Sequence, residues 1–286
     1  MKQGIALLLT GLLLIGFIPN AAPQASIAFS MSFSDNQINL NVSPGANRTA
    51  CTELVISNEG NGDIDVEGNT TEDDLVITPS NFSVSIETGG SASVFMCITA
   101  ATGSLHRNVQ VTINASAEDQ YGNKAENESA DIAVIVEPYA SLSTHPELPY
   151  QKVCSSEVEV LNFIVVNNGN YQDTIAVEVL NAEDLLDAGF MVALEAAQYV
   201  INASGEQPVQ VTILTPAFDA SSDNNHTITF QARTTLNGET ISHNSTAIVD
   251  ISDCGTEAEE GEERVPSVSL ISSIAAMGII ALRRRY

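Results

Sequence analysis

The middle of the chain carries one pattern twice, at a spacing of about 110 residues. LVISNEGN (54–61) aligns without a gap on FIVVNNGN (163–170). In both copies an apolar run enters an Asn-x-Gly-Asn turn, and a second alternating run follows, DIDVEG (63–68) or DTIAVEV (173–179). Asn and Gly suit this turn because they adopt positive φ at low cost. The repeat therefore predicts two copies of one β-domain.

Alternation of apolar and polar residues continues through both copies. GSASVFMCIT (90–99) corresponds to GEQPVQVTIL (205–214), and the copies end on SADIAVIVEP (129–138) and STAIVDIS (245–252). Such runs, separated by Gly, Asn, Asp and Ser turns and rich in Val, Ile and Thr, predict an all-β fold of antiparallel sandwiches. Only NAEDLLDAG (181–189) indicates a short helical turn.

The predicted domain limits follow from the two copies and the segment between them. Residues 26–140 and 141–254 form the two predicted domains, each large enough to bury its own core. EPYASLSTHPELPY (137–150) contains three prolines and is the predicted stiff connection.

This strand–NNGN–strand signature resembles the immunoglobulin-like repeats of microbial surface proteins, the CARDB-like group among them. The resemblance covers most of residues 27–254. It implies a seven-stranded immunoglobulin-like sandwich in each domain, and a role in adhesion, spacing or display. It brings no catalytic residues with it.

The C-terminal end predicts a membrane anchor. Residues 265–282 carry no formal charge, and as a helix they would span about 27 Å, close to a bilayer core of roughly 30 Å. Arg283, Arg284 and Arg285 follow, and basic residues beside a span stay on the cytoplasmic side. The acidic stretch 255–264 is the predicted stalk outside the membrane. A buried core helix of a soluble domain is the alternative.

The N-terminal end predicts export. Lys2 precedes an apolar run from Ile5 to Ile18, and the small residues of PNAAPQAS (19–26) suit peptidase cleavage, so residues 1–25 are a predicted signal peptide. An uncleaved signal anchor is the alternative. Together the two ends predict a single-pass cell-membrane protein, with residues 26–264 outside the cell and the tail 283–286 in the cytoplasm.

The C-terminal arrangement is also similar to the sorting tails of archaeal and some bacterial surface proteins, such as the PGF-CTERM type. That type combines a short Pro-containing signature, a hydrophobic helix and a terminal Arg cluster. Here VPSVSL (265–270) stands where the family has Pro-Gly-Phe. The signature itself is thus missing, whereas the predicted hydrophobic helix and the Arg cluster are present. The similarity implies a membrane anchor, in contact with lipid through the helix.

The net charge of the predicted ectodomain excludes one class of partner. All 36 acidic residues lie between positions 27 and 263, where only five basic residues occur, so this part carries a net charge of −31. A field of that sign repels nucleic acid and other polyanions. The predicted partners are therefore membrane lipid and unidentified surface proteins or glycans, and nucleic acid is excluded.

Four cysteines predict two disulfides, because an even cysteine count in an exported chain is typical of bridged domains. None forms a C-x-x-C pair, which argues against a zinc site. Of the three possible pairings, Cys51–Cys97 and Cys154–Cys254 keep each bridge inside one domain. Alternation also places Cys51 and Cys97 on the outward side of their strands. Free thiols are the alternative.

Nine Asn-x-Ser/Thr triplets occur, about twice the number expected by chance. Each predicts an accessible position in an exported chain and a candidate glycosylation site. The asparagines are Asn41, Asn47, Asn69, Asn81, Asn114, Asn127, Asn202, Asn225 and Asn244.

One acidic cluster raises the question of calcium. Asn61, Asp63 and Asp65 alternate as oxygen ligands do in calcium loops. The competing interpretation is a hairpin turn and the outward face of the next strand, which the second copy supports because NNGNYQDTIAV (167–177) keeps the turn without the acid density. Apart from this calcium candidate, no cofactor is expected.

The sequence shows no nucleophile motif, phosphate loop or metalloprotease motif, and a non-enzymatic protein is expected. The chain has no Trp, and Tyr121, Tyr171 and Tyr199 are scattered near predicted turns, so no aromatic platform for a sugar is proposed. The leading hypothesis is a membrane-anchored surface protein with a structural or adhesive role, or a subunit of an envelope complex. The alternative is an extracellular module that binds calcium or a glycan.

Overall fold

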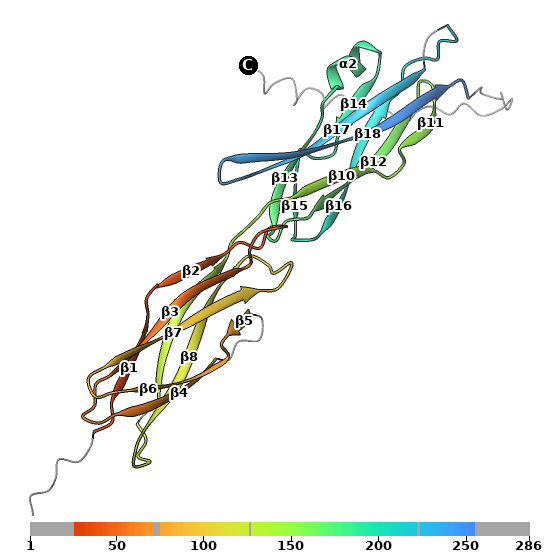
Figure 1. Ribbon diagram of the computed structural model, residues 1–286. Helices are drawn as coiled ribbons and strands as arrows, with labels where there is room; N and C mark the ends of the chain where they lie inside the picture. The colour runs from red at the N-terminus through yellow and green to blue at the C-terminus, as the bar shows by residue number, and fades with distance from the viewer. Residues whose placement is uncertain (1–25, 71–74, 126, 222–223, 255–286) are drawn as a thin grey trace, which may run out of the picture. The chain divides into compact units, whose positions relative to one another are not determined.

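The computed structural model describes residues 26–70, 75–125, 127–221 and 224–254 (Figure 1). The predicted signal peptide, acidic stalk, membrane helix and Arg283, Arg284 and Arg285 lie outside these residues. Within the described ranges, no helix has both the length and the apolar character needed to cross a bilayer.

The chain forms two compact units. The first combines the described residues up to Leu40 with Arg48–Ala101 and Asn108–Ile135. The second combines Asn41–Asn47 and Thr102–Arg107 with the described residues from Val136 to Cys254.

The first unit is a sandwich of a four-stranded and a five-stranded sheet. Their strand orders are β1-β3-β7-β5 and β2-β9-β8-β4-β6. The strands are β1 (Phe29–Phe33), β2 (Gln37–Leu40), β3 (Thr49–Asn58), β4 (Ile64–Thr70), β5 (Leu75–Thr78), β6 (Asn81–Ile86), β7 (Ser91–Ala100), β8 (Arg107–Asp119) and β9 (Glu128–Val136).

The second unit has the same two sheets, with orders β10-β12-β16-β14 and β11-β18-β17-β13-β15. Adding nine to each strand number of the first unit gives the second, so the repeat in sequence is also a repeat in topology. The elements are β10 (Leu142–Pro146), β11 (Tyr150–Cys154), β12 (Val158–Asn167), β13 (Asp173–Val179), α2 (Ala182–Asp187), β14 (Met191–Leu194), β15 (Gln198–Ile201), β16 (Glu206–Leu214), β17 (Asn225–Leu236) and β18 (Glu239–Ser252).

The all-β fold is confirmed, and two details of the expectation are wrong. Each unit has nine strands, where the family resemblance implied seven. The sandwiches are also not wholly antiparallel, because β11 pairs with β18 in parallel, with Tyr150 opposite Ile248.

The parallel pair follows from a break in the first strand of the second unit. β10 runs antiparallel to β12 as far as Pro146, and β11 begins at Tyr150, directly after Pro149. Proline lacks the N–H that a strand ladder needs and is confined to strand edges and ends. The first strand is split here, and its second half continues on the other sheet. The first unit has the same break between β1 and β2 without a proline, so the break belongs to the shared topology. Part of the predicted connection 137–150 is thus strand β10.

Strict alternation builds the two cores. In β3 and β7 the side chains of Leu54, Ile56 and Met96 are fully buried, and their sequence neighbours face outward. In the second unit, the rings of Phe163 on β12 and Phe230 on β17 stack with centroids 4.6 Å apart. Because successive side chains of a strand point to opposite faces, each sheet keeps one face for the core and one for solvent.

Candidate functional site

The first asparagine of the Asn-x-Gly-Asn turn holds the turn in place through side-chain hydrogen bonds in both units. Asn58 is buried, and its side-chain amide donates to the carbonyl oxygens of Gly62 (2.8 Å), Ile86 (3.2 Å) and Glu87 (3.2 Å). Its side-chain oxygen accepts from the amide N–H of Gly60 at 2.9 Å. A buried amide with all these partners ties the turn to the end of β6 and satisfies backbone groups that would otherwise be orphaned.

A row of three asparagines crosses the outer face of the five-stranded sheet in the first unit. Asn69 on β4 lies directly opposite Asn81 on β6 and directly opposite Asn114 on β8. All three side chains are exposed, whereas their neighbours Gly68 and Ala115 are buried. Alternation along three adjacent strands therefore presents the three amides side by side to solvent.

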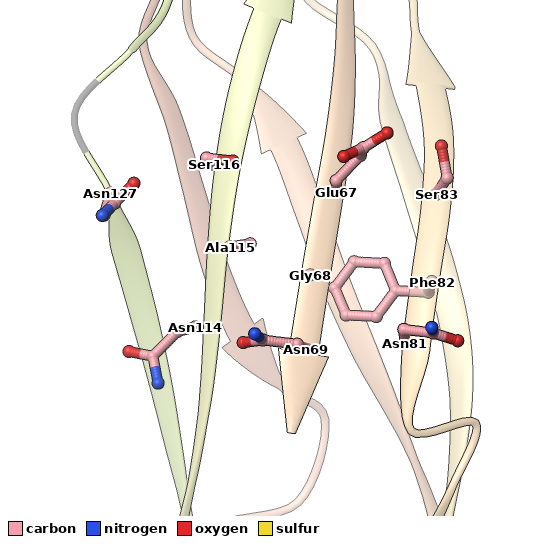
Figure 2. A pocket seen from close by; sticks show the side chains of 10 residues that line it. All are labelled: Glu67, Gly68, Asn69, Asn81, Phe82, Ser83, Asn114, Ala115, Ser116 and Asn127. Carbon is pink, nitrogen blue, oxygen red and sulfur yellow. The ribbon is translucent and has the colours of Figure 1, made fainter. Parts of the chain in front are cut away.

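An open groove of about 760 Å³ lies along this row (Figure 2). Figure 2 shows Asn81, Asn69 and Asn114 at one level of the sheet, with Glu67 and Ser83 at the next level. Four of the ten lining residues are predicted glycosylation asparagines. The lining consists of Glu67, Gly68, Asn69, Asn81, Phe82, Ser83, Asn114, Ala115, Ser116 and Asn127.

Gly68, in the middle of β4, lies on the core-facing side of the sheet, opposite to the side that carries Asn69. A Cβ atom added to Gly68 would overlap the ring of Phe82, which lies against the glycine backbone. Gly68 is directly opposite Phe82 in the register, so the ring of one strand covers the bare backbone of the other. Glycine in a strand interior is otherwise unfavourable, and close approach of a neighbouring group is a common reason for it.

Two charged residues of this face have partners near the row, whereas Glu67 lines the groove beside it. Asp65, further back along β4, accepts a hydrogen bond from the hydroxyl of Ser85 on β6. Glu118 on β8 lies 3.8 Å from the ammonium group of Lys124. The three asparagines themselves are different, because within the described part of the chain no residue hydrogen-bonds to their side chains. The row is thus a neutral, solvent-facing set of amides.

All nine predicted glycosylation asparagines are exposed. Strand geometry also places the hydroxyl residue of a triplet on the same side as its asparagine, as for Asn81 with Ser83 and for Asn114 with Ser116. Sequence reasoning identified each asparagine separately but not the row. The row becomes visible only through the cross-strand register of β6, β4 and β8.

The three calcium candidates accept hydrogen bonds from two other segments, one at Ser26 and one at Ser85–Thr88. The side-chain oxygen of Asn61 accepts from the N–H of Ser26 at 2.9 Å, and Asp63 accepts from the N–H of Thr88 at 2.9 Å. Asp65 accepts from Ser85, as above. Among the described residues, no group of three or more His, Cys, Asp or Glu side chains could hold a metal ion.

Both disulfides chosen from the repeat are present. Cys51 on β3 lies directly opposite Cys97 on β7, and their sulfur atoms are bonded. Cys51 is exposed, so this bridge lies on the outer face of the four-stranded sheet. Cys154, at the end of β11, is bonded to Cys254, beyond the end of β18, and this bridge ties the last described residue of the chain to its sandwich.

The candidate tyrosines have different surroundings. Tyr121 is exposed, whereas Tyr171 and Tyr199 are half-buried. Burial, with the nearby negative charge of Asp173, raises the pKa of Tyr171 to about 12. The Tyr171 hydroxyl donates to the Asp173 carboxylate at 3.2 Å, and the same carboxylate accepts from Thr234 at 2.6 Å. Tyr171 therefore belongs to a structural network at the base of β13.

Comparisons with known proteins find only distant structural similarity. No family model matches the chain, and no curated protein matches it. The extracellular domains 1–5 of protocadherin gamma B2 are 12% identical, over 82% of this chain and 42% of that chain, with a TM-score of 0.46. Domains EC1-2 of human protocadherin-24 are 12% identical over 81% and 100%, with a TM-score of 0.40. The D00-D0 domain of intimin is 13% identical over 78% and 99%, with a TM-score of 0.33. Because all three TM-scores are below 0.5, the fold is described from its strand order and register alone.

Proposed function

We propose that this chain is a non-catalytic surface protein that displays two immunoglobulin-like sandwiches outside the cell, held by one C-terminal membrane anchor. Its role is structural or adhesive, or that of a subunit in an envelope complex. The observation that carries the proposal is that two disulfide-bonded sandwiches expose all nine candidate glycosylation asparagines. Disulfides persist in oxidising compartments, and an accessible Asn-x-Ser/Thr triplet has a chemical meaning only in an exported chain.

The charge supports the same location. The segment between positions 27 and 263 carries five basic and 36 acidic residues. This charge keeps a displayed domain soluble and monomeric, and it opposes binding to polyanions. The predicted signal peptide and the predicted helix 265–282 would place this acidic segment outside and Arg283, Arg284 and Arg285 inside.

The chemistry of the groove supports display or binding. Its walls are mainly amides and hydroxyls, which neither attack substrates unaided nor exchange protons near neutral pH. Such groups accept covalent modification, or they bind polar ligands through hydrogen bonds.

A second candidate function rests on the same groove: an unmodified face of this kind could bind an extracellular glycan through its amides. The two candidates exclude each other at the row, because an asparagine that carries a sugar cannot also hydrogen-bond a ligand in the groove. Unmodified ectodomain, made without a glycosylation system, can be titrated with oligosaccharides released from the cell surface. Binding that is lost in Asn69→Ala would favour this second candidate, and no binding would remove it.

The proposal is tested on protein taken from the cells that make it. Living cells are treated with a membrane-permeant alkylating reagent, and the purified protein is digested without reduction and analysed by mass spectrometry. We expect linked peptides for Cys51–Cys97 and Cys154–Cys254, and sugar on peptides that contain the exposed triplets. Alkylated cysteines together with unmodified asparagine peptides would overturn it.

A further inference from the structure

We propose that Asn81, Asn69 and Asn114 form one crowded modification site, in which a glycan on Asn69 excludes glycans on both neighbours. Each folded molecule then carries either the central glycan or one or both of the outer two. This inference rests on the proposed export and glycosylation. It goes further by making the occupancy of three triplets interdependent.

The first step is the spacing. Asn69 faces Asn81 and Asn114 in two antiparallel pairs. Directly opposite residues of such a pair have Cβ atoms about 4.5–5.5 Å apart, and side chains stand roughly perpendicular to the sheet. A sugar ring with its hydroxyl groups is wider than this spacing. Two sugars attached to opposite asparagines would therefore compete for the same space above the sheet.

The second step is the distance between the outer asparagines. Asn81 and Asn114 are on β6 and β8, with β4 between them. Neighbouring strands lie about 4.7–4.9 Å apart, so the outer two are separated by roughly 10 Å. Two sugars fit at that separation if the central asparagine is bare.

The third step is the state of the three amides. Within the described part of the chain, none of them is hydrogen-bonded through its side chain. Other triplet asparagines are engaged: Asn41 accepts from the hydroxyl of Ser43 at 2.7 Å, and Asn202 accepts from Gln172 at 2.7 Å. The row is therefore exposed and available to a modifying enzyme in the folded protein.

The second unit provides an internal comparison. Glu178 stands at the position of Asn69, because each lies fifteen residues after the aligned Leu54 or Phe163. Glu178 faces Gln231, as Asn69 faces Asn114. Here the polar groups satisfy one another: Glu178 lies 3.9 Å from Arg233, and Gln231 donates to Asn244 at 2.8 Å. The shared topology therefore does not require a row of asparagines without hydrogen-bond partners. Such a row is a feature of the first unit.

The experiment measures glycan occupancy at each asparagine in full-length protein from its own cells, by glycopeptide mass spectrometry. Asn69→Gln is expected to raise occupancy at both Asn81 and Asn114. Asn81→Gln is expected to raise occupancy at Asn69 and, through it, to lower occupancy at Asn114. Ser83→Ala removes the same triplet while keeping its asparagine, and it should reproduce the Asn81→Gln result, which excludes a folding effect.

Asn202→Gln, in the second unit, is the matched control and should leave the row unchanged. Three results would each overturn this inference and leave the proposed function standing. The glycan occupancies of the three asparagines could be independent of one another, or Asn69 and a neighbour could both carry sugar in one molecule. The third result is a row that is never modified although Asn202 or Asn225 is. An absence of sugar from all nine triplets would overturn both.

Discussion

The side-chain amide of Asn167 donates a hydrogen bond of 2.8 Å to the carbonyl oxygen of Tyr171, four residues further along the chain. Asn58 makes the same 2.8 Å bond to Gly62 in the first unit. Both asparagines also donate to the carbonyl oxygen that ends the sixth strand of their unit, that of Ile86 or Ile201. The repeated signature in the sequence is therefore one hydrogen-bonded turn used twice.

Loss of this buried amide should destabilise the unit that contains it. In Asn167→Ala, the carbonyl groups of Tyr171 and Ile201 and the N–H of Gly169 lose a partner. Leaving buried polar groups unsatisfied costs about 1–3 kcal/mol, so the free energy of unfolding should fall by about 2 kcal/mol. Chemical denaturation measures it. Exposed Asn168→Ala is the control, with an expected change below about 0.5 kcal/mol, and equal effects of the two substitutions would contradict the account.

The two disulfides should differ in their contribution to stability. They link residues 46 and 100 positions apart. In the chain-entropy model these loops correspond to about 4 and 4.7 kcal/mol. Thermal unfolding of Cys51→Ala/Cys97→Ala and of Cys154→Ala/Cys254→Ala, each compared with the oxidised parent, tests this. A variant with an unchanged melting temperature would show that its bridge does not constrain the fold.

Gly68 and Phe82 should be coupled. Gly68→Ala forces the Phe82 ring from its place over β4, and overpacking of this kind typically costs about 1–3 kcal/mol. The same substitution in a Phe82→Ala background should cost less, because the space is then free. Gly62→Ala is the control, since an added Cβ there meets nothing within 4 Å. Additive effects in the double-mutant cycle would show that the two residues do not interact.

Alkaline pH should weaken the second unit through Tyr171. Its pKa is raised from 10.0 to about 12 in the folded protein by burial first and by Asp173 second. The folded state therefore holds this proton more tightly than the unfolded state, and the stability that results is complete below pH 10 and declines between pH 10 and about 12. Tyr171→Phe should lessen the fall in unfolding free energy across that window, and an unchanged pH slope in the variant would contradict the assignment.

Alternation and turn residues were sufficient to predict the all-β fold and the repeat. They indicated the outward sides of β3 and β7, because a period of two is visible in a single strand. Strand pairing is not visible in this way. The sequence predicts a connection at 137–150, where the structure has a strand that breaks between Pro146 and Tyr150 and continues as β11, paired in parallel with β18.

The candidate site shows the same limit. Asn69, Asn81 and Asn114 were all identified as glycosylation candidates, but twelve and thirty-three residues separate them in sequence. Only the register of β6, β4 and β8 brings them into one row. The calcium candidates alternate along one segment, and their side-chain oxygens accept hydrogen bonds from Ser26, Ser85 and Thr88; calcium binding there stays a prediction.

The location of the two sandwiches is the central claim, and one measurement tests it most directly. Lys124 and Lys152 are exposed and are the only lysines between residues 27 and 263. Intact cells are treated with a membrane-impermeant amine-reactive label, and the two lysine-containing peptides are quantified before and after lysis. The account predicts that both lysines are labelled on intact cells, while a cytosolic protein in the same sample is not. Labelling of Lys124 and Lys152 only after lysis would contradict it.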